Sequence, residues 1–324
     1  MVTRPEAAVS REIEQAHADL QRVIESVESV IFGKRRVVEY LLISMLSGGH
    51  VLIEDVPGVG KTMLSRALAK SVELDFKRIQ FTPDLLPSDL TGNMVYNQKT
   101  GEFYFKQGPL FANMVLADEI NRTSPRTQSA LLEAMEEQQV TVDGIAHELP
   151  YPFFVIATQN PIEHQGTYAL PEAQLDRFLL KVRVGYPADS EEMAILESQQ
   201  VRHPIEDVTP VISPARLMEL RELVKTVHIT QSIRRYIVRI VNETRHHPDV
   251  LVGCSPRGSL GLGRAAQAAA VLARRDYVVP DDIQEMAPLV LGHRLFLLTE
   301  SQLAGVTPRR IVDDIISRVP VPAE

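Results

Sequence analysis

The chain has 324 residues, of which 44% are hydrophobic and 23% charged, a length that suits about two domains and a composition typical of a globular protein. Its 34 basic and 42 acidic residues give a formal net charge of −8, which argues against a surface that binds nucleic acid or anionic membrane throughout, although a local basic channel would be compatible with it. The one cysteine, Cys254, excludes a disulfide framework and a multi-cysteine zinc site.

The N-terminal segment carries acidic residues where a secretory signal would have its apolar core, and no apolar run of the chain reaches the length of a membrane span. We therefore expect a cytoplasmic protein that is not embedded in a membrane. Apolar residues at spacings of three and four predict an amphipathic helix over residues 10–31, with Ser10 as its N-cap.

Five short apolar runs follow, and they are nearly continuous rather than alternating, as strands of a parallel sheet are when both faces are buried. They lie at residues 50–54, 76–81, 114–117, 153–158 and 179–184. Helical patterns separate most of them, including 61–71 and a helix that opens at Ser124-Pro125. This alternation predicts an α/β domain over roughly the first 185 residues.

Two further patterns predict hairpins within this domain. Asp143-Gly144 between β-prone residues is typical of a type I′ turn, and residues 94–97 and 102–106 flank a second turn. In the second hairpin, Phe103 and Phe105 point the same way, so they could contact another molecule or pack onto the domain.

Beyond residue 187 the pattern is helical only. The predicted helices, punctuated by prolines, are residues 191–200, 213–226, 232–245, 256–274, 281–293 and 307–317. We expect a separate helical domain there.

A phosphate-binding loop is indicated at residues 55–62 (DVPGVGKT), between the first strand and a helix. The two glycines let backbone amides face a phosphate, Lys61 can reach the β- and γ-phosphates, and the Thr62 hydroxyl can bind Mg²⁺. The common P-loop pattern has glycine at the position of Asp55, whose side chain we expect to point away from the loop.

Polar groups end the third and fourth strands. Asp118 and Glu119 follow residues 114–117, so Asp118 can hold Mg²⁺ and Glu119 can act as the general base for an attacking water. Asn160 follows the fourth strand at the same sheet edge and can orient that water.

Three arginines are candidates for stabilising charge on a transferred phosphoryl group. Arg177 precedes the last strand, Arg257 begins a helix of the second domain with Ser255 as its N-cap, and Arg122 lies just after Glu119. Each could equally be a structural ion pair.

In this order the groups resemble those of AAA+ ATPases, and longer strings resemble the MoxR branch of that family. The strings are residues 81–89 (FTPDLLPSD), 117–122 (ADEINR), 157–161 (ATQNP) and 166–178 (GTYALPEAQLDRF). The resemblance extends over about residues 30–320.

The resemblance implies a P-loop AAA+ core with a five-stranded parallel sheet whose first strand is central, followed by a small all-α lid. It divides the chain into an N-terminal helix (1–30), a core (31–187) with an insert hairpin at about 91–109, and a linker and lid (188–324). Asn160 matches sensor 1, Arg177 an arginine finger that acts on a neighbouring subunit, and Arg257 a lid arginine, sensor 2, that couples nucleotide to lid movement. The nucleotide-contacting residues expected are Ile31, Asp55, Val56, Pro57, Gly58, Val59, Gly60, Lys61, Thr62 and Met63.

The resemblance further implies ATP and Mg²⁺ as cofactors, a ring-shaped homo-oligomer, often a hexamer, and chaperone-like action on client proteins, including clients with a von Willebrand factor A domain. No nucleic-acid partner is expected. The alternatives are a nucleotide-gated switch or adaptor with weak hydrolysis, a DNA-directed AAA+ protein, and another P-loop class. The guanine-reading string of a GTPase is not matched by residues 97–100 (NQKT).

Overall fold

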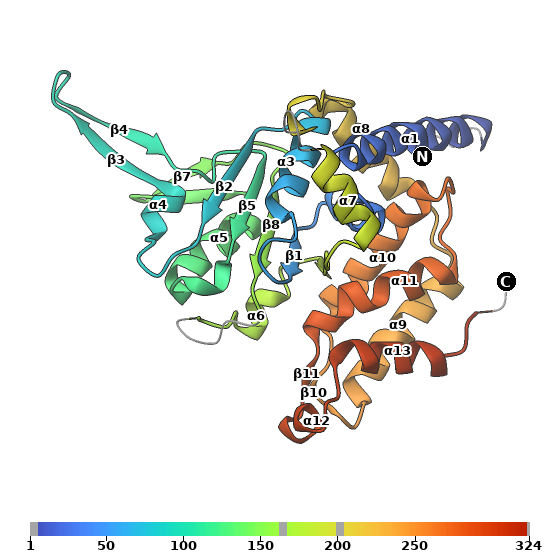
Figure 1. Cartoon of the computed structure of the whole chain (residues 1–324). Helices are drawn as coiled ribbons and strands as arrows, with labels where there is room; N and C mark the ends of the chain where they lie inside the picture. Colours follow the sequence, from blue (N-terminus) through green and yellow to red (C-terminus); the bar gives the residue numbers. More distant parts are fainter. Residues whose placement is uncertain (1–5, 162–166, 199–203, 323–324) are drawn as a thin grey trace.

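The computed structural model describes residues 6–161, 167–198 and 204–322, and shows a sheet flanked by helices beside a mainly helical C-terminal half (Figure 1). The first residue of the string 166–178 and the last two of the predicted helix 191–200 lie outside the described residues. The five strands of the main sheet are β1 (Val51–Glu54), β2 (Phe76–Gln80), β5 (Met114–Asp118), β8 (Phe154–Gln159) and β9 (Leu180–Val182).

These strands lie in the order β2-β5-β8-β1-β9, and all their pairings are parallel. The parallel five-stranded sheet predicted from the sequence is confirmed. One detail was wrong, because β8 is central and β1 lies between β8 and the edge strand β9. Since all the strands run the same way, the segments that follow β1, β5 and β8 meet at one edge of the sheet.

The continuous apolar runs arise because each strand packs side chains into two hydrophobic cores, one on each face of the sheet. Alternate residues such as Ile53 and Leu116 pack into the larger core, with α1 (Glu6–Glu28), α2 (Arg35–Leu46), α3 (Lys61–Ser71) and the C-terminal half. Their neighbours, such as Leu52 and Val115, pack into the smaller core, with α4 (Pro87–Thr91) and α5 (Pro125–Glu137). Successive residues of a strand point to opposite faces, so both faces of the sheet are buried.

The two N-terminal helices differ from expectation. Helix α1 begins at Glu6, so Ser10 lies inside the helix and is not its N-cap. Helix α2 was not predicted, since eight of its twelve residues are buried and its apolar run lacks the one-sided period of an amphipathic helix.

Two hairpins extend from the first half of the chain. Strands β6 (Gln139–Val142) and β7 (Ile145–Glu148) are joined by Asp143 and Gly144, whose φ angles of +50° and +81° agree with the expected type I′ turn. Strands β3 (Gly92–Asn97) and β4 (Glu102–Gln107) form the second hairpin, which projects away from the body of the molecule (Figure 1).

The aromatic side chains of the β3-β4 hairpin have different surroundings. Phe105 stacks on His147, with ring centroids 4.0 Å apart, and is therefore packed onto the β6-β7 hairpin. Phe103 is 66% exposed and touches Tyr96 on the opposite strand. The two phenylalanines lie on the same face of the hairpin but differ in their surroundings. Phe105 lies near the base and is packed, whereas Phe103 lies nearer the tip and is exposed.

The C-terminal half contains the helices α7 (Asp189–Ser198), α8 (Pro214–Thr226), α9 (Gln231–His246), α10 (Pro256–Leu272), α11 (Pro280–Leu291), α12 (Thr299–Leu303) and α13 (Pro308–Arg318). It is not purely helical, since β10 (Val250–Val252) pairs antiparallel with β11 (Phe296–Leu297). These strands are two or three residues long, too short for a strand period to be read from the sequence.

The short helical segments of the two halves are α6 (Glu172–Leu175), η1 (Ile120–Arg122), η2 (Pro204–Glu206) and η3 (Gly292–Arg294). In the described ranges, no helix combines the length and hydropathy needed to cross a bilayer.

A buried histidine joins three elements at the start of β1. The His50 Nε2 atom lies 3.1 Å from the carbonyl of Met135, and Nδ1 accepts a hydrogen bond of 3.0 Å from the Val155 amide. Nδ1 is therefore the unprotonated nitrogen of a neutral ring. Burial lowers the pKa of His50 from 6.5 to about 4.

We expect the protein to lose stability as the pH falls from 6.5 towards 4. The unfolded chain binds a proton at His50 over this range while the folded chain does not, so the free energy of unfolding decreases by roughly 2 kcal/mol between neutral pH and about pH 5, and this group has little effect on it above about pH 7. Urea unfolding at several pH values measures this. His50→Gln keeps a donor and an acceptor without a titrating ring and should lessen the pH dependence, the remainder including that of buried His293, whereas His246→Gln, at an exposed site, should leave it unchanged. An equal pH dependence in His50→Gln and the parent would contradict the assignment.

Candidate functional site

The predicted phosphate loop lies between β1 and α3, and α3 begins at Lys61. Gly58 and Gly60 have φ angles of +87° and +84°, a left-handed backbone that glycine adopts without strain. The first amides of α3 have no partners within the helix, and together with the loop amides they form a site for an anion. The local geometry is thus that of a P-loop.

Lys61 is the first residue of α3, directly after this loop. Its ammonium group donates a 2.9 Å hydrogen bond to the carbonyl of Asp55. Burial lowers the pKa of Lys61, while the charges of Asp118, Asp55 and Glu119 raise it. The lysine and the carboxylates at the end of β5 thus lie at the same edge of the sheet and interact electrostatically.

The Asp55 side chain points away from the phosphate loop, as expected, and it has a structural partner. Its Oδ2 atom accepts hydrogen bonds from the amides of Val184, at 2.8 Å, and Gly185, at 2.6 Å, just beyond β9. Oδ1 accepts the amide of Val56. Asp55, at the position where other P-loops commonly have glycine, thus attaches the start of the loop to the segment that follows β9.

We expect Asp55→Ala to lower the free energy of unfolding by about 2 kcal/mol, since bonds from amides to a charged group are stronger than neutral ones and the site is half-buried. Urea unfolding measures the change. Asp55→Asn retains one acceptor oxygen and should lose less. An Asp55→Ala protein as stable as the parent would show that these bonds contribute nothing.

Asp118 ends β5 with both carboxylate oxygens engaged. Thr158 donates its hydroxyl to Oδ1 at 2.6 Å, and the Arg78 guanidinium donates to Oδ2 from Nη2, at 2.7 Å, and from Nε, at 3.1 Å. Thr158 is on β8 and Arg78 on β2, the two neighbours of β5. The carboxylate is therefore held at the sheet edge by both adjacent strands.

Glu119 is the first residue after β5 and has a left-handed backbone with a φ angle of +59°. Its amide donates to the Thr158 hydroxyl at 2.8 Å. Its Oε2 atom accepts a 2.8 Å bond from the Gln80 amide group and lies 3.1 Å from Nε of Arg122. Arg122, the third candidate arginine, is therefore paired with Glu119, and both of these contacts are made by one oxygen of the carboxylate, Oε2.

Asn160 follows β8, between the strand ends that carry Asp118 and the P-loop. Its side chain is buried, and its carbonyl accepts a 3.3 Å bond from the Asn121 side chain. The order of strands thus brings Lys61, Asp118, Glu119 and Asn160 to one edge of the sheet. Arg78, Gln80 and Thr158 were not identified from the sequence, although the spacing of Arg78 and Gln80, which places both on one face of β2, is a usable signal.

Ile31, which is expected to contact the nucleotide, belongs to a segment (residues 31–33) that lies beside the chain following β9. Lys34 donates a 2.8 Å bond to the carbonyl of Tyr186, and its ammonium lies 3.7 Å from Glu191 of α7. Ile31 is half-buried and packs against the larger core. Residues 31–34 and the P-loop are thus both attached to residues 184–191.

Arg177 and Arg257 lie at the opposite edge of the sheet from the P-loop. Both pair with Glu136 at the end of α5: Arg177 Nε is 3.0 Å from Oε2, and Arg257 Nη2 is 2.5 Å from Oε1. With Gly49 and His50, which precede β1, they line a hollow of about 370 Å³. Since β1 alone spans roughly 13 Å, neither arginine is brought to the P-loop of its own chain. For Arg257 this differs from a lid arginine that senses the nucleotide of its own subunit.

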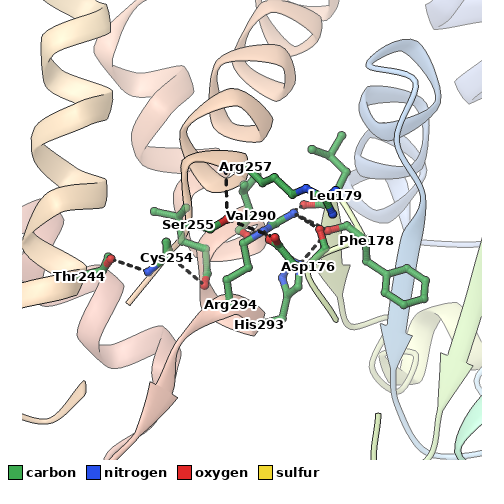
Figure 2. A network of polar contacts seen from close by, with 11 residues as sticks. Asp176, Phe178, Leu179, Thr244, Cys254, Ser255, Arg257, Val290, His293 and Arg294 are labelled. Carbon is green, nitrogen blue, oxygen red and sulfur yellow. Dashed lines mark hydrogen bonds and ion pairs between the residues drawn. The ribbon is translucent and has the colours of Figure 1, made fainter. Parts of the chain in front are cut away.

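Residues next to Arg177 and Arg257 in the sequence are joined by a network of hydrogen bonds centred on Asp176, which we call the Asp176 junction. Arg294, which is 6% exposed, donates from Nε to Asp176 Oδ1 at 2.7 Å and from Nη2 to the Phe178 carbonyl at 2.6 Å. Ser255, the N-cap of α10, donates to Asp176 Oδ2 at 3.2 Å. Figure 2 shows Arg294 and Ser255 meeting at Asp176. Asp176 thus binds α10 and η3 to the segment that carries Arg177.

Cys254, which precedes Ser255, lies to one side of this junction and is buried (Figure 2). Burial raises the pKa of its thiol to about 11. Its amide donates a 3.0 Å bond to the Thr244 hydroxyl. A protonated, enclosed thiol is poorly reactive, so Cys254 is best interpreted as a small packed side chain.

Two family models match the chain: the ATPase family associated with various cellular activities (AAA) over residues 50–180, and the AAA lid domain over residues 242–315. The chain is 56% identical to YeaC of Bacillus subtilis, covering 96% of this chain and 97% of that protein. It is 42% identical to the chaperone MoxR1 of Mycobacterium tuberculosis, covering 94% and 82%. A crystal structure of a candidate ATPase from Cytophaga hutchinsonii superposes with a TM-score of 0.91, at 40% identity and covering 98% of this chain and 99% of that one.

Proposed function

The chain belongs to the MoxR family of AAA+ ATPases, and on this premise we propose that it hydrolyses ATP with Mg²⁺ and remodels client proteins as a ring of identical subunits. The observation that carries the proposal is that the parallel sheet places Lys61, Asp118 and Glu119 at the one edge where the P-loop opens. Phosphate binding and water activation need these groups within a few ångströms of one another.

In this proposal the P-loop amides and Lys61 bind the β- and γ-phosphates. The donors for a metal ion are the Thr62 hydroxyl and the Asp118 carboxylate, hard oxygen ligands of the kind that Mg²⁺ prefers. Bound Mg²⁺ would neutralise charge on the phosphates, and Arg78 and Thr158 would keep Asp118 in place.

Glu119 is the proposed general base. Freed from Gln80 and Arg122, its carboxylate would accept a proton from a water aligned with the γ-phosphate, and the Asn160 side chain would orient that water. The left-handed backbone at Glu119 and its amide bond to Thr158 hold the start of this side chain at the strand end.

Arg177 and Arg257 are proposed to act on the nucleotide of a neighbouring subunit. Their position at the opposite edge of the sheet supports this, because one subunit then has a P-loop on one side and an arginine pair on the other. Such a head-to-tail contact closes into a ring when the rotation between subunits is right, and a hexamer is the proposed assembly.

We place the domain divisions near residues 30 and 187, with the protruding β3-β4 hairpin as the insert of the core, and propose a cytoplasmic location. The exposed Tyr96 and Phe103 of the hairpin favour a protein client over DNA. A von Willebrand factor A domain is the client class we propose.

The test is ATP turnover per subunit as a function of protein concentration, with Mg²⁺ and with excess chelator. A site completed by a neighbour should be nearly inactive when dilute and activate as subunits assemble, and the chelator should abolish turnover. Turnover that is independent of concentration, or that persists without divalent metal, would overturn the proposal in favour of a self-contained enzyme or a non-hydrolysing switch.

A further inference from the structure

Glu136 holds an arginine of the core and an arginine of the lid on a single carboxylate. Its two oxygens are separately engaged, Oε2 by Arg177 and Oε1 by Arg257. The three residues come from α5, from the turn before β9 and from the first turn of α10, so they are distant in sequence. No motif in the sequence distinguishes Glu136 from Glu137 beside it.

The pairs leave much of each guanidinium available. Arg177 contacts Glu136 through Nε, and Arg257 through Nη2, whereas each guanidinium carries five N–H donors. The Arg257 side chain is 54% exposed and that of Arg177 is 27% exposed. One negative charge between two positive ones keeps a net positive charge that a phosphate can contact.

The backbone beneath the pair is held by the Asp176 junction. Asp176 precedes Arg177 and accepts bonds from Arg294 and from Ser255, which caps the helix of Arg257 (Figure 2). Arg294 donates to the carbonyl of Phe178 on the other side of Arg177. The backbone that carries both arginines is therefore held in place by the same hydrogen bonds, and Glu136 determines the direction of the two side chains.

We propose that Glu136 is a positioning residue that presents Arg177 and Arg257 together to the phosphates of nucleotide bound to a second copy of this chain. The inference rests on the proposed function, in which these arginines complete a neighbour's site. Without Glu136 the two guanidiniums repel each other and occupy many rotamers, so fewer subunits present both in the productive geometry.

The experiment compares Glu136→Ala with Glu137→Ala, which removes the adjacent exposed carboxylate of the same helix end. We expect Glu136→Ala to lower kcat about 10- to 100-fold, the scale of a small misplacement of catalytic groups. Its affinity for a fluorescent ADP analogue should not change, since its own P-loop is intact. Glu137→Ala should retain kcat. To separate this effect from misfolding, Glu136→Gln, which keeps the side-chain size, is measured in parallel, and its kcat should fall between those of Glu136→Ala and the parent.

The decisive measurement mixes Glu136→Ala with Lys61→Ala subunits, which cannot turn over ATP but carry an intact arginine surface. Recovery of turnover on mixing supports the inference, and Arg177→Ala mixed in the same way is the reference. If Arg177→Ala is rescued but Glu136→Ala is not, or if Glu136→Ala and Glu136→Gln are both fully active alone, the role of Glu136 is overturned and the proposed function stands. If Arg177→Ala is not rescued, the action between subunits fails, and the inference fails with it.

Discussion

Glu119→Gln is expected to bind ATP and hydrolyse almost none. The substitution keeps the size of the side chain and removes the charge that lets it accept a proton, so kcat should fall roughly 10²- to 10⁴-fold, the contribution of a general base. The P-loop and Lys61 are unaltered, so nucleotide affinity should be maintained. Single-turnover hydrolysis of radiolabelled ATP, together with equilibrium binding of a fluorescent analogue, separates the two effects.

The matched control is Glu137→Gln, an exposed carboxylate of α5. Near-parental turnover by Glu119→Gln would mean that another group activates the water. The same variant, trapped with ATP, offers a way to identify the client, because a protein that binds the ATP state would remain associated with it.

Arg177→Ala should lose turnover by about 10³-fold or more, the scale on which an arginine supplied by a neighbouring subunit stabilises the transferred phosphoryl group. Its own P-loop is undisturbed, so ATP affinity should be near that of the parent. Removing the side chain also frees Glu136 from one partner, but Arg257 remains paired with it, which limits any effect on stability.

Mixing distinguishes action between subunits from action within one. Arg177→Ala and Lys61→Ala should each be inactive alone, and an equal mixture should recover turnover at about a quarter of its interfaces, where an intact P-loop faces an intact arginine. A mixture as inactive as its components would leave no support for an arginine supplied by the neighbour.

Most of the groups at the sheet edge that carries the P-loop could be predicted from the sequence, because their positions depend on which residues are consecutive in the chain. A P-loop needs consecutive residues between a strand and a helix, and Asp118, Glu119 and Asn160 each follow an apolar run directly. Parallel strands bring their carboxyl ends to one edge, so recognising the strands was sufficient to predict that these groups meet. The continuous burial of β5 and β8 made that recognition secure.

The side chains that pair with these groups could not be predicted from the sequence. Arg78 lies 40 positions from Asp118, and Glu136 lies 121 positions from Arg257. Nothing local requires either pairing. The strands β10 and β11 and helix α2 escaped prediction for related reasons, since the strands are too short to show a period and the helix is buried on too many sides to be amphipathic.

The sequence by itself determined the fold class, the phosphate loop and the identity of the groups that follow each strand, because these depend on residue order and on the periods of strand and helix. Only the tertiary structure decided that β1 is not the central strand and that Asp55 binds the segment beyond β9. It also decided that Arg177 and Arg257 share Glu136 at the edge opposite the P-loop. Such pairings are determined by which segments the folded cores bring together across long stretches of chain, and no local pattern specifies them.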